Sequence, residues 1–166
     1  MQTEGPKRTA LNPNGGAAAR PLLGIVTGGV IAGGCDISYA VGMGLRAGRP
    51  ASRTLKSVAS GLLGRPAFDG GADIAALGLL LHFVIALGWA MVFFVASRKL
   101  AFLRSSNPVL VGPLFGALVY VMMNRVIVPL SAAPFTLPMQ FSGLAVHMFL
   151  VGLPIAVMVS RFAPSK

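Results

Sequence analysis

The chain has 166 residues, of which 55% are hydrophobic and only 11% are charged, and its mean hydropathy is +0.77. Soluble domains carry about 25% charged residues, so this composition excludes an ordinary soluble protein. The net charge of +10 does not indicate a nucleic-acid partner, because the bases lie in short tails and loops beside apolar stretches. In that position, lysine and arginine orient a membrane protein.

Four apolar stretches are each long enough to cross a bilayer as a helix. They run over residues 21–45, 72–97, 108–130 and 139–162. A helix needs about 20 residues to span about 30 Å of hydrocarbon. The sequence therefore predicts an all-α integral membrane bundle of four transmembrane helices.

Prolines mark the starts and the interior of these predicted helices. Pro21 and Pro108 stand where the first and third begin, because a proline at the first helical position has no N–H to leave unpaired. Pro154 lies well inside the fourth and should kink it. Residues 1–20 are basic and lack apolar periodicity, which predicts a flexible tail. The transmembrane domain then covers residues 21–162, with a short tail at 163–166.

The connection between the first two spans contains a short amphipathic helix. Its apolar residues recur at helical spacing, namely Leu55, Val58, Ala59 and Leu62. Arg53 and Lys56 fall on the other side. A helix too short to span is expected to lie flat at the interface, with Arg53 and Lys56 toward anionic lipid headgroups. Packing of this helix on the ends of the bundle is the alternative.

The distribution of bases predicts the orientation. Eight bases lie in the two tails and the second connection, five lie in the first connection, and the third connection has none. Because the positive side stays inside, both termini are expected in the cytoplasm. If the amphipathic helix requires anionic lipid of the inner leaflet, this orientation inverts.

Spaced glycines predict where helices approach closely. Gly29 and Gly33 lie four residues apart in the first span, and Gly112 and Gly116 lie four apart in the third. Small residues at this spacing let two backbones come together, which favours association where lipid removes the hydrophobic driving force. These glycines either close the bundle or join two copies in a homo-oligomer.

Ionisable side chains inside the spans are the sharpest functional signal, because they are costly in hydrocarbon and usually face the bundle interior. At 1.5 Å per residue, Asp36, His82, Arg125 and His147 lie about 13, 15, 8 and 12 Å from the same membrane face. Asn124 is adjacent to Arg125. The sequence therefore predicts one polar layer in one half of the bilayer, which is the outer half if both termini are inside.

This polar layer has two interpretations. One is a buried polar network that fixes helix packing, in which Asp36 pairs with Arg125 and each lowers the cost of the other. The second is a proton or small-ion relay that uses Asp36 and the two histidines, because an unperturbed histidine changes charge near neutral pH. We expect the first, a structural or accessory membrane component, with a proton- or ion-linked small transporter or channel as the alternative.

No catalytic or cofactor-binding pattern accompanies the spans. A metal site would need a third ligand beside His82 and His147, and Asp36 is the only candidate. A heme held by the two histidines is the least favoured hypothesis. We expect no cofactor and no enzymatic activity, and Trp89 and Tyr120, which fall mid-span, are interpreted as core packing.

Several local patterns resemble a family of small bacterial membrane proteins of unassigned function. They are Gly-Gly-x-x-Ala-Gly-x-x-Asp at 28–36, Ala-Ser-Gly-Leu-Leu-Gly at 59–64, Gly-Leu-x-x-His-Phe at 78–83, and His-x-Phe-x-x-Gly-Leu-Pro at 147–154. The resemblance covers most of residues 21–162. It implies four helices in a bacterial inner membrane, and it supplies no activity, substrate or cofactor.

Overall fold

The computed structural model describes residues 15–162, and all regular structure in that range is helical. Four helical segments are long and apolar enough to cross a membrane, Ala19–Arg46, Ala72–Lys99, Pro108–Leu130 and Phe141–Phe162. The predicted all-α bundle is confirmed, and the chain is a multi-pass membrane protein. Large apolar side chains such as Leu80, Leu110 and Leu114 cover its outside, as contact with lipid requires.

The first helix, α1 (Gly15–Arg46), begins earlier than the sequence predicted. Pro21 lies inside this helix, so the expected start at Pro21 and the expected tail through residue 20 are wrong for residues 15–20. The run of alanines at 17–19 explains the difference, because alanine has the highest helix propensity of any residue. The rest of the two predicted tails, 1–14 and 163–166, lies outside the described residues.

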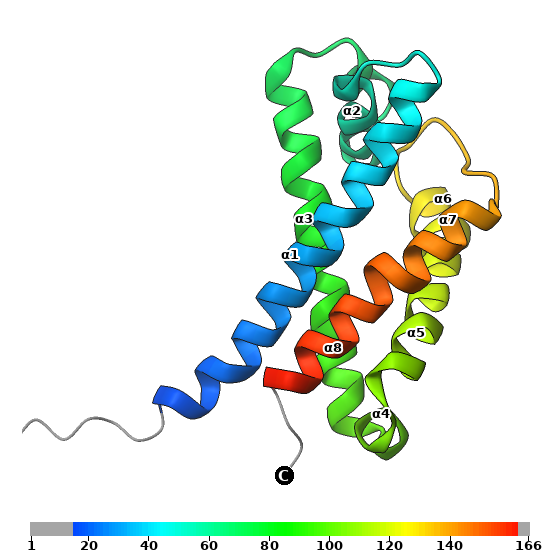
Figure 1. The fold of residues 1–166 in the computed structure, drawn as a ribbon. Coiled ribbons are helices and arrows are strands. Elements are labelled where there is room, and N and C mark those ends of the chain that lie inside the picture. Colours follow the sequence, from blue (N-terminus) through cyan, green and yellow to red (C-terminus); the bar gives the residue numbers. More distant parts are fainter. Residues whose placement is uncertain (1–14, 163–166) are drawn as a thin grey trace, which may run out of the picture.

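The spans form a bundle with both ends of the described chain at the same end (Figure 1). The helices after α1 are α2 (Ala51–Leu63), α3 (Ala72–Lys99), α4 (Ala101–Ser105) and α5 (Pro108–Met122), and a 3₁₀ turn, η1 (Arg65–Phe68), follows α2. α1 packs against α3 on one side and α8 (Leu153–Phe162) on the other, and α5 packs against α8. We call the end with α4 and the chain ends the terminal half, and the other end the loop half.

Two spans contain a widened π-helical turn just before a proline. η2 (Met123–Ile127) precedes α6 (Val128–Leu130), and η3 (His147–Gly152) connects α7 (Phe141–Val146) to α8. In each, the N–H of the residue before the proline bonds five residues back, Val128 to Met123 and Leu153 to Met148. Because Pro129 and Pro154 donate no hydrogen bond, the helix can open there at low cost. The kink expected at Pro154 thus takes the form of a π-turn.

The short helix α2 packs against the loop half of the bundle. A Cβ on Gly78 of α3 would collide with the carbonyl of Leu55, and a Cβ on Gly44 of α1 would lie 2.6 Å from the Thr54 hydroxyl. Ala59 and Ser60 are fully buried. Of the two alternatives for the amphipathic helix, the structure therefore shows the second, packing on the bundle. Arg53 stays exposed with its guanidinium carbon 5.4 Å from the ring centre of Phe68.

Each glycine that the sequence singled out lies at a close helix–helix contact within the chain. A Cβ on Gly29 would meet Leu87, and one on Gly33 would meet Phe83 and Ala86, so both sit where α1 crosses α3. On α5, a Cβ on Gly112 would lie 2.7 Å from Leu153 Cα, and one on Gly116 would collide with the carbonyl of His147. Gly152 of η3 contacts the same surface of α5, because a Cβ on it would collide with the carbonyl of Gly112. The glycines thus hold η3, and His147 with it, against α5.

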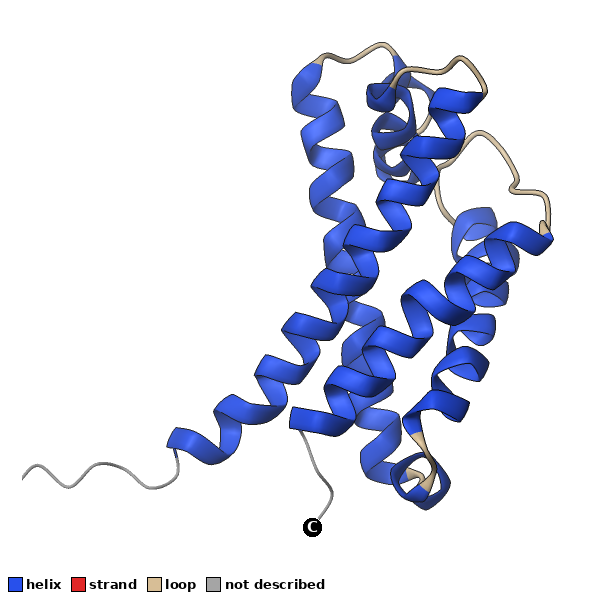
Figure 2. Cartoon of the chain, viewed as in Figure 1, coloured by secondary structure: helices blue, strands red, loops and turns tan. Residues whose placement is uncertain are grey.

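The hydrophobic core lies in the terminal half. Its buried members come from the first part of α1, the last part of α3, the first part of α5 and the last part of the fourth span, with Phe93 and Ile155 fully enclosed. The core continues across the gap between α3 and α5 through ring contacts of Phe115 with Trp89 and Phe93. Figure 2 shows the loop that follows α6 at the opposite end.

Candidate functional site: a polar cavity in one half of the bundle

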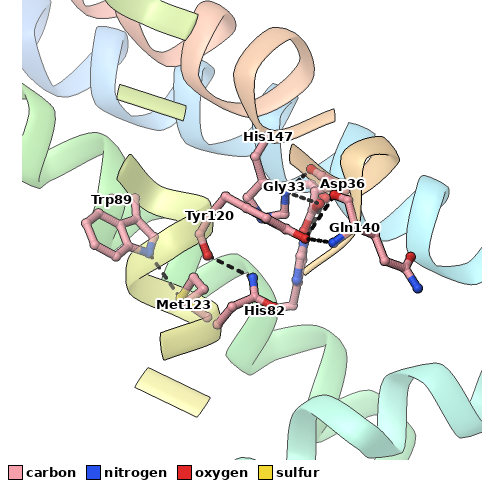
Figure 3. A network of polar contacts seen from close by, with 10 residues as sticks. Gly33, Asp36, His82, Trp89, Tyr120, Met123, Gln140 and His147 are labelled. Carbon is pink, nitrogen blue, oxygen red and sulfur yellow. Dashed lines mark hydrogen bonds and ion pairs between the residues drawn. The ribbon is translucent and has the colours of Figure 1, made fainter. Parts of the chain in front are cut away.

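A cavity of about 660 Å³ occupies the loop half of the bundle. Its wall is mostly apolar and is built from all four spans, from α2, and from the segment that joins α6 to α7. Four of the five predicted polar residues line it: Asp36, His82, Asn124 and His147. Figure 3 shows Asp36, His82, Tyr120 and His147 converging from α1, α3, α5 and η3. The predicted polar layer thus surrounds a space between the helices.

Asp36 and His147 lie beside each other in the wall of this cavity. Asp36 Oδ1 lies 3.9 Å from His147 Nδ1, and the two side chains are only 23% and 18% exposed. The His147 ring folds back along its own helix, so that Nδ1 also lies 2.9 Å from the carbonyl oxygen of Gly143. The Tyr120 ring packs edge-on against it at 5.0 Å between centres. The imidazole is therefore held in one orientation beside the carboxylate.

His82 joins α3 to α1. Its Nε2 lies 2.9 Å from the carbonyl oxygen of Gly33. The two helices come this close because Gly33 has no side chain, since a Cβ there would lie 3.0 Å from Phe83 Cδ1. The predicted packing glycine and the predicted polar histidine therefore belong to a single contact.

Tyr120 ties the loop before α7 to α5. Its hydroxyl donates to the carbonyl of Gln140 at 3.0 Å and accepts from the Gln140 N–H at 2.6 Å. The buried Asn124 donates from its amide nitrogen to the carbonyl of Tyr120 at 2.8 Å, one turn back. These bonds fix the edge of the cavity at the point where the chain enters the fourth span.

Arg125 does not take part, and the predicted Asp36–Arg125 pair is wrong. The Arg125 side chain is exposed and lies outside the cavity lining, and within residues 15–162 Asp36 makes its ion-pair contact with His147. Depth along the membrane normal was predicted from residue spacing, whereas the direction around the helix axis depends on the π-turn that contains both Asn124 and Arg125. In that turn Asn124 faces inward and Arg125 faces outward.

The core packing predicted for Trp89 and Tyr120 is confirmed, because Tyr120 is buried and Trp89 packs against the core. The sequence did not reveal that both also line the cavity and use their polar atoms. The Trp89 indole N–H points to the Met123 sulfur at 3.4 Å, across the gap between α3 and η2. One signal was available for Tyr120, because it lies four residues before Asn124 and so shares its helix face.

The cavity brings together few groups able to hold a metal. Among residues 15–162, no three side chains of His, Cys, Asp or Glu form a group that could bind one. The two histidines bond to backbone carbonyls on different helices, with Asp36 beside only one of them.

Comparison with family models, curated proteins and solved structures finds no match for this chain.

Proposed function

We propose that this chain is an accessory membrane protein that binds a small molecule in the cavity, within one half of the bilayer. The observation that carries the proposal is the gathering of Asp36, His82, Asn124 and His147 around a mostly apolar space of about 660 Å³. Ligand sites typically measure about 300–1,000 Å³ and combine an apolar wall with a few placed polar groups. A network that served packing alone would not need an open volume between its members.

Binding is favoured over conduction because, among the residues that the structure describes, the polar groups of the cavity do not continue into the terminal half. The core beneath the cavity consists of tightly packed apolar side chains such as Phe93, Val111 and Ile155. An ion crossing a single chain would have to leave its polar partners and pass this core, at a cost of many kcal/mol. We infer a binding role without catalysis, because the other histidine of the lining, His82, bonds to the Gly33 carbonyl, and among the described residues no contact joins it to the Asp36–His147 pair.

A proton-linked transporter is the second candidate, and the Asp36–His147 contact of 3.9 Å is the observation that favours it. Carboxylate and histidine groups in membranes form proton relays. Such a protein would need either a second conformation that opens the terminal half or a path between copies in a homo-oligomer.

The test combines proton flux with ligand uptake by the purified chain. In proteoliposomes with an internal pH dye, we expect no flux above that of empty liposomes. In detergent, a neutral naphthalene dye should bind at one site per chain with a blue-shifted emission. Ala40→Phe, which fills the cavity, should abolish that signal, whereas Ala76→Phe on the outside of α3 should not.

Two results would contradict the proposal. Flux that Asp36→Asn abolishes would establish the proton-linked candidate in its place. Dye binding that is equal in both alanine variants would show that the cavity is not the binding site.

We propose, on the distribution of bases and the family resemblance, that the protein resides in a bacterial inner membrane with both termini in the cytoplasm. This orientation puts the cavity in the outer leaflet. Arg53 and Lys56 on α2 are then the expected contacts with lipid headgroups. Protection of tags at both termini from protease in intact spheroplasts would support the orientation. Digestion of both tags would show that the termini lie outside the cell membrane and that the orientation is the inverse.

A further inference from the structure

The hydrogen bonds of the cavity occupy a donor on each of five side chains, namely His82, His147, Asn124, Tyr120 and Trp89, and leave several acceptors. A backbone carbonyl can only accept, so the ring nitrogen that faces one must carry a proton. His82 Nε2 therefore donates to Gly33, and His147 Nδ1 donates to Gly143. In the neutral form, the second nitrogen of each ring, Nδ1 of His82 and Nε2 of His147, is an acceptor.

Asn124 and Tyr120 follow the same pattern. One N–H of the Asn124 amide donates to a backbone carbonyl, which leaves its side-chain oxygen as an acceptor together with its second N–H. The Tyr120 hydroxyl donates its only proton to the carbonyl of Gln140. The Trp89 N–H points to the sulfur of Met123. Together with the two histidines, five side chains of the cavity thus each have a donor occupied inside the protein.

The charges in the cavity complete this picture. Asp36 is the only carboxylate in the lining, and Arg49, the only lysine or arginine there, is exposed. The remaining titratable groups that face the cavity are Tyr39, Tyr120 and the two histidines. A carboxylate and several acceptors set in an apolar wall suit a ligand with an apolar body and a positively charged N–H donor.

We propose that the cavity binds a primary ammonium ion that carries an apolar chain, with the ammonium group at Asp36. This inference rests on the proposed binding function and names its ligand class. An ammonium group has three donors and no acceptor, which matches the acceptors that Asp36 and the neutral histidines present. Both a free lipophilic amine and the headgroup of an aminophospholipid have this chemistry.

The gap between α3 and η2 gives such a ligand a path from the lipid. A second, apolar cleft of about 340 Å³ lies there, lined by Ile85, Gly88, Val92 and Ile127 together with Trp89 and Met123. Ile85, Trp89, Met123 and Ile127 line the main cavity as well, so the two spaces adjoin. Only the Trp89–Met123 contact crosses this gap among the hydrogen bonds of residues 15–162 (Figure 3).

Trp89 supplies a built-in reporter, because it is the only tryptophan and it lines the cavity. The full chain in phosphatidylcholine nanodiscs is titrated with octylammonium, octyltrimethylammonium, octanol and octanoate while Trp89 emission is recorded. We expect saturable binding of octylammonium at least about tenfold tighter than that of octanoate. Octyltrimethylammonium, which has the charge without the N–H donors, should fall between octylammonium and octanol.

Variants assign the effect to the carboxylate. Asp36→Asn should weaken octylammonium binding by about tenfold or more and leave octanol binding unchanged. Asp36→Glu, which keeps the carboxylate, should bind octylammonium within a few-fold of wild type. This variant keeps the test decisive if Asp36→Asn does not fold. Asp73→Asn is the matched control, because Asp73 is an exposed acid outside the cavity on α3. It should not change the affinity.

The outcomes separate this inference from the proposed function. Equal binding of octanol, octanoate and octylammonium would overturn the ammonium class and leave the binding function standing. No Trp89 response to any of the four probes, with no dye uptake, would overturn both. Equal loss in Asp36→Asn and Asp73→Asn would mean that surface charge alone attracts the cation, and this too would overturn the inference.

Two further arms identify the source and the path. If phosphatidylethanolamine in the nanodisc competes with octylammonium, the natural ligand is the lipid headgroup, and if it does not, the ligand is a free amine. Gly88→Phe, which fills the cleft between α3 and η2, should slow octylammonium association with little change in affinity. Leu80→Phe on the lipid-facing side of the same helix should not. Equal association rates in these two variants would overturn the lipid path.

Discussion

The same four spans build two different interiors. In the terminal half the helices cross on small residues, so that a Cβ on Gly24 would lie 3.0 Å from the Met158 carbonyl and one on Gly28 would lie 3.2 Å from Ile155 Cα. In the loop half, η2 widens the third span before Pro129, η3 begins at His147, and α2 packs against α1 and α3. The difference teaches that close backbone contact seals one end, whereas at the other end the spans, α2 and the loop at 131–140 surround a cavity.

The largest expected effect comes from disturbing the close contact that anchors η3. Gly116→Val should lower the free energy of unfolding by about 3 kcal/mol or more, because the new side chain would overlap the His147 carbonyl and Met148. Thermal unfolding in detergent measures this. Gly34→Ala is the control, since nothing lies within 4 Å of a Cβ at that position. Wild-type stability of the Gly116 variant would mean that the helices do not touch there.

The next effect tests what holds the edge of the cavity. Tyr120→Phe removes both bonds to Gln140 and should cost about 2 kcal/mol of unfolding free energy. Hydrogen exchange should rise in the loop at 131–140 while the terminal half stays protected. Tyr39→Phe should change stability by less than about 0.5 kcal/mol, since the Tyr39 hydroxyl makes no hydrogen bond to the described residues. Equal losses of unfolding free energy in the Tyr120 and Tyr39 variants would contradict the role of the two Tyr120 bonds in holding the edge of the cavity.

A smaller effect is expected from the Asp36–His147 pair. A double-mutant cycle with Asp36→Asn and His147→Phe should give a coupling of about 1 kcal/mol, measured as unfolding free energy. Additive single effects would show that the 3.9 Å contact carries no energy.

The smallest effect is expected at Arg125. Because this side chain is exposed and separate from Asp36, Arg125→Leu should alter the unfolding free energy by less than about 0.5 kcal/mol. It should also fail to restore stability to Asp36→Asn. Restoration in the double variant would reinstate the pair that the sequence predicted.

The spans were predictable because length and apolarity alone define them, and the third span, at 108–130, begins and ends as expected. That Asp36, His82 and His147 lie at one level of the bundle was predictable, because the helical rise is constant. The direction of Arg125 was not, because it depends on a π-turn that a period of 3.6 does not describe. The cavity was not predictable either, since its walls include α2 and the loop at 131–140, whose positions depend on tertiary contacts such as the Ala132 N–H bond to Gly61.

The most direct measurement compares the reactivity of one cysteine in each half. In a Cys35→Ser background, Ser57→Cys places a thiol on the cavity wall and Ala90→Cys places one in the fully buried core. A small neutral thiol reagent that permeates lipid and water should modify the Ser57 variant about ten times faster or more, because a close-packed core admits no reagent. Similar rates for the two variants in the folded protein, or faster reaction in the core, would contradict a molecule that is hollow in one half and sealed in the other.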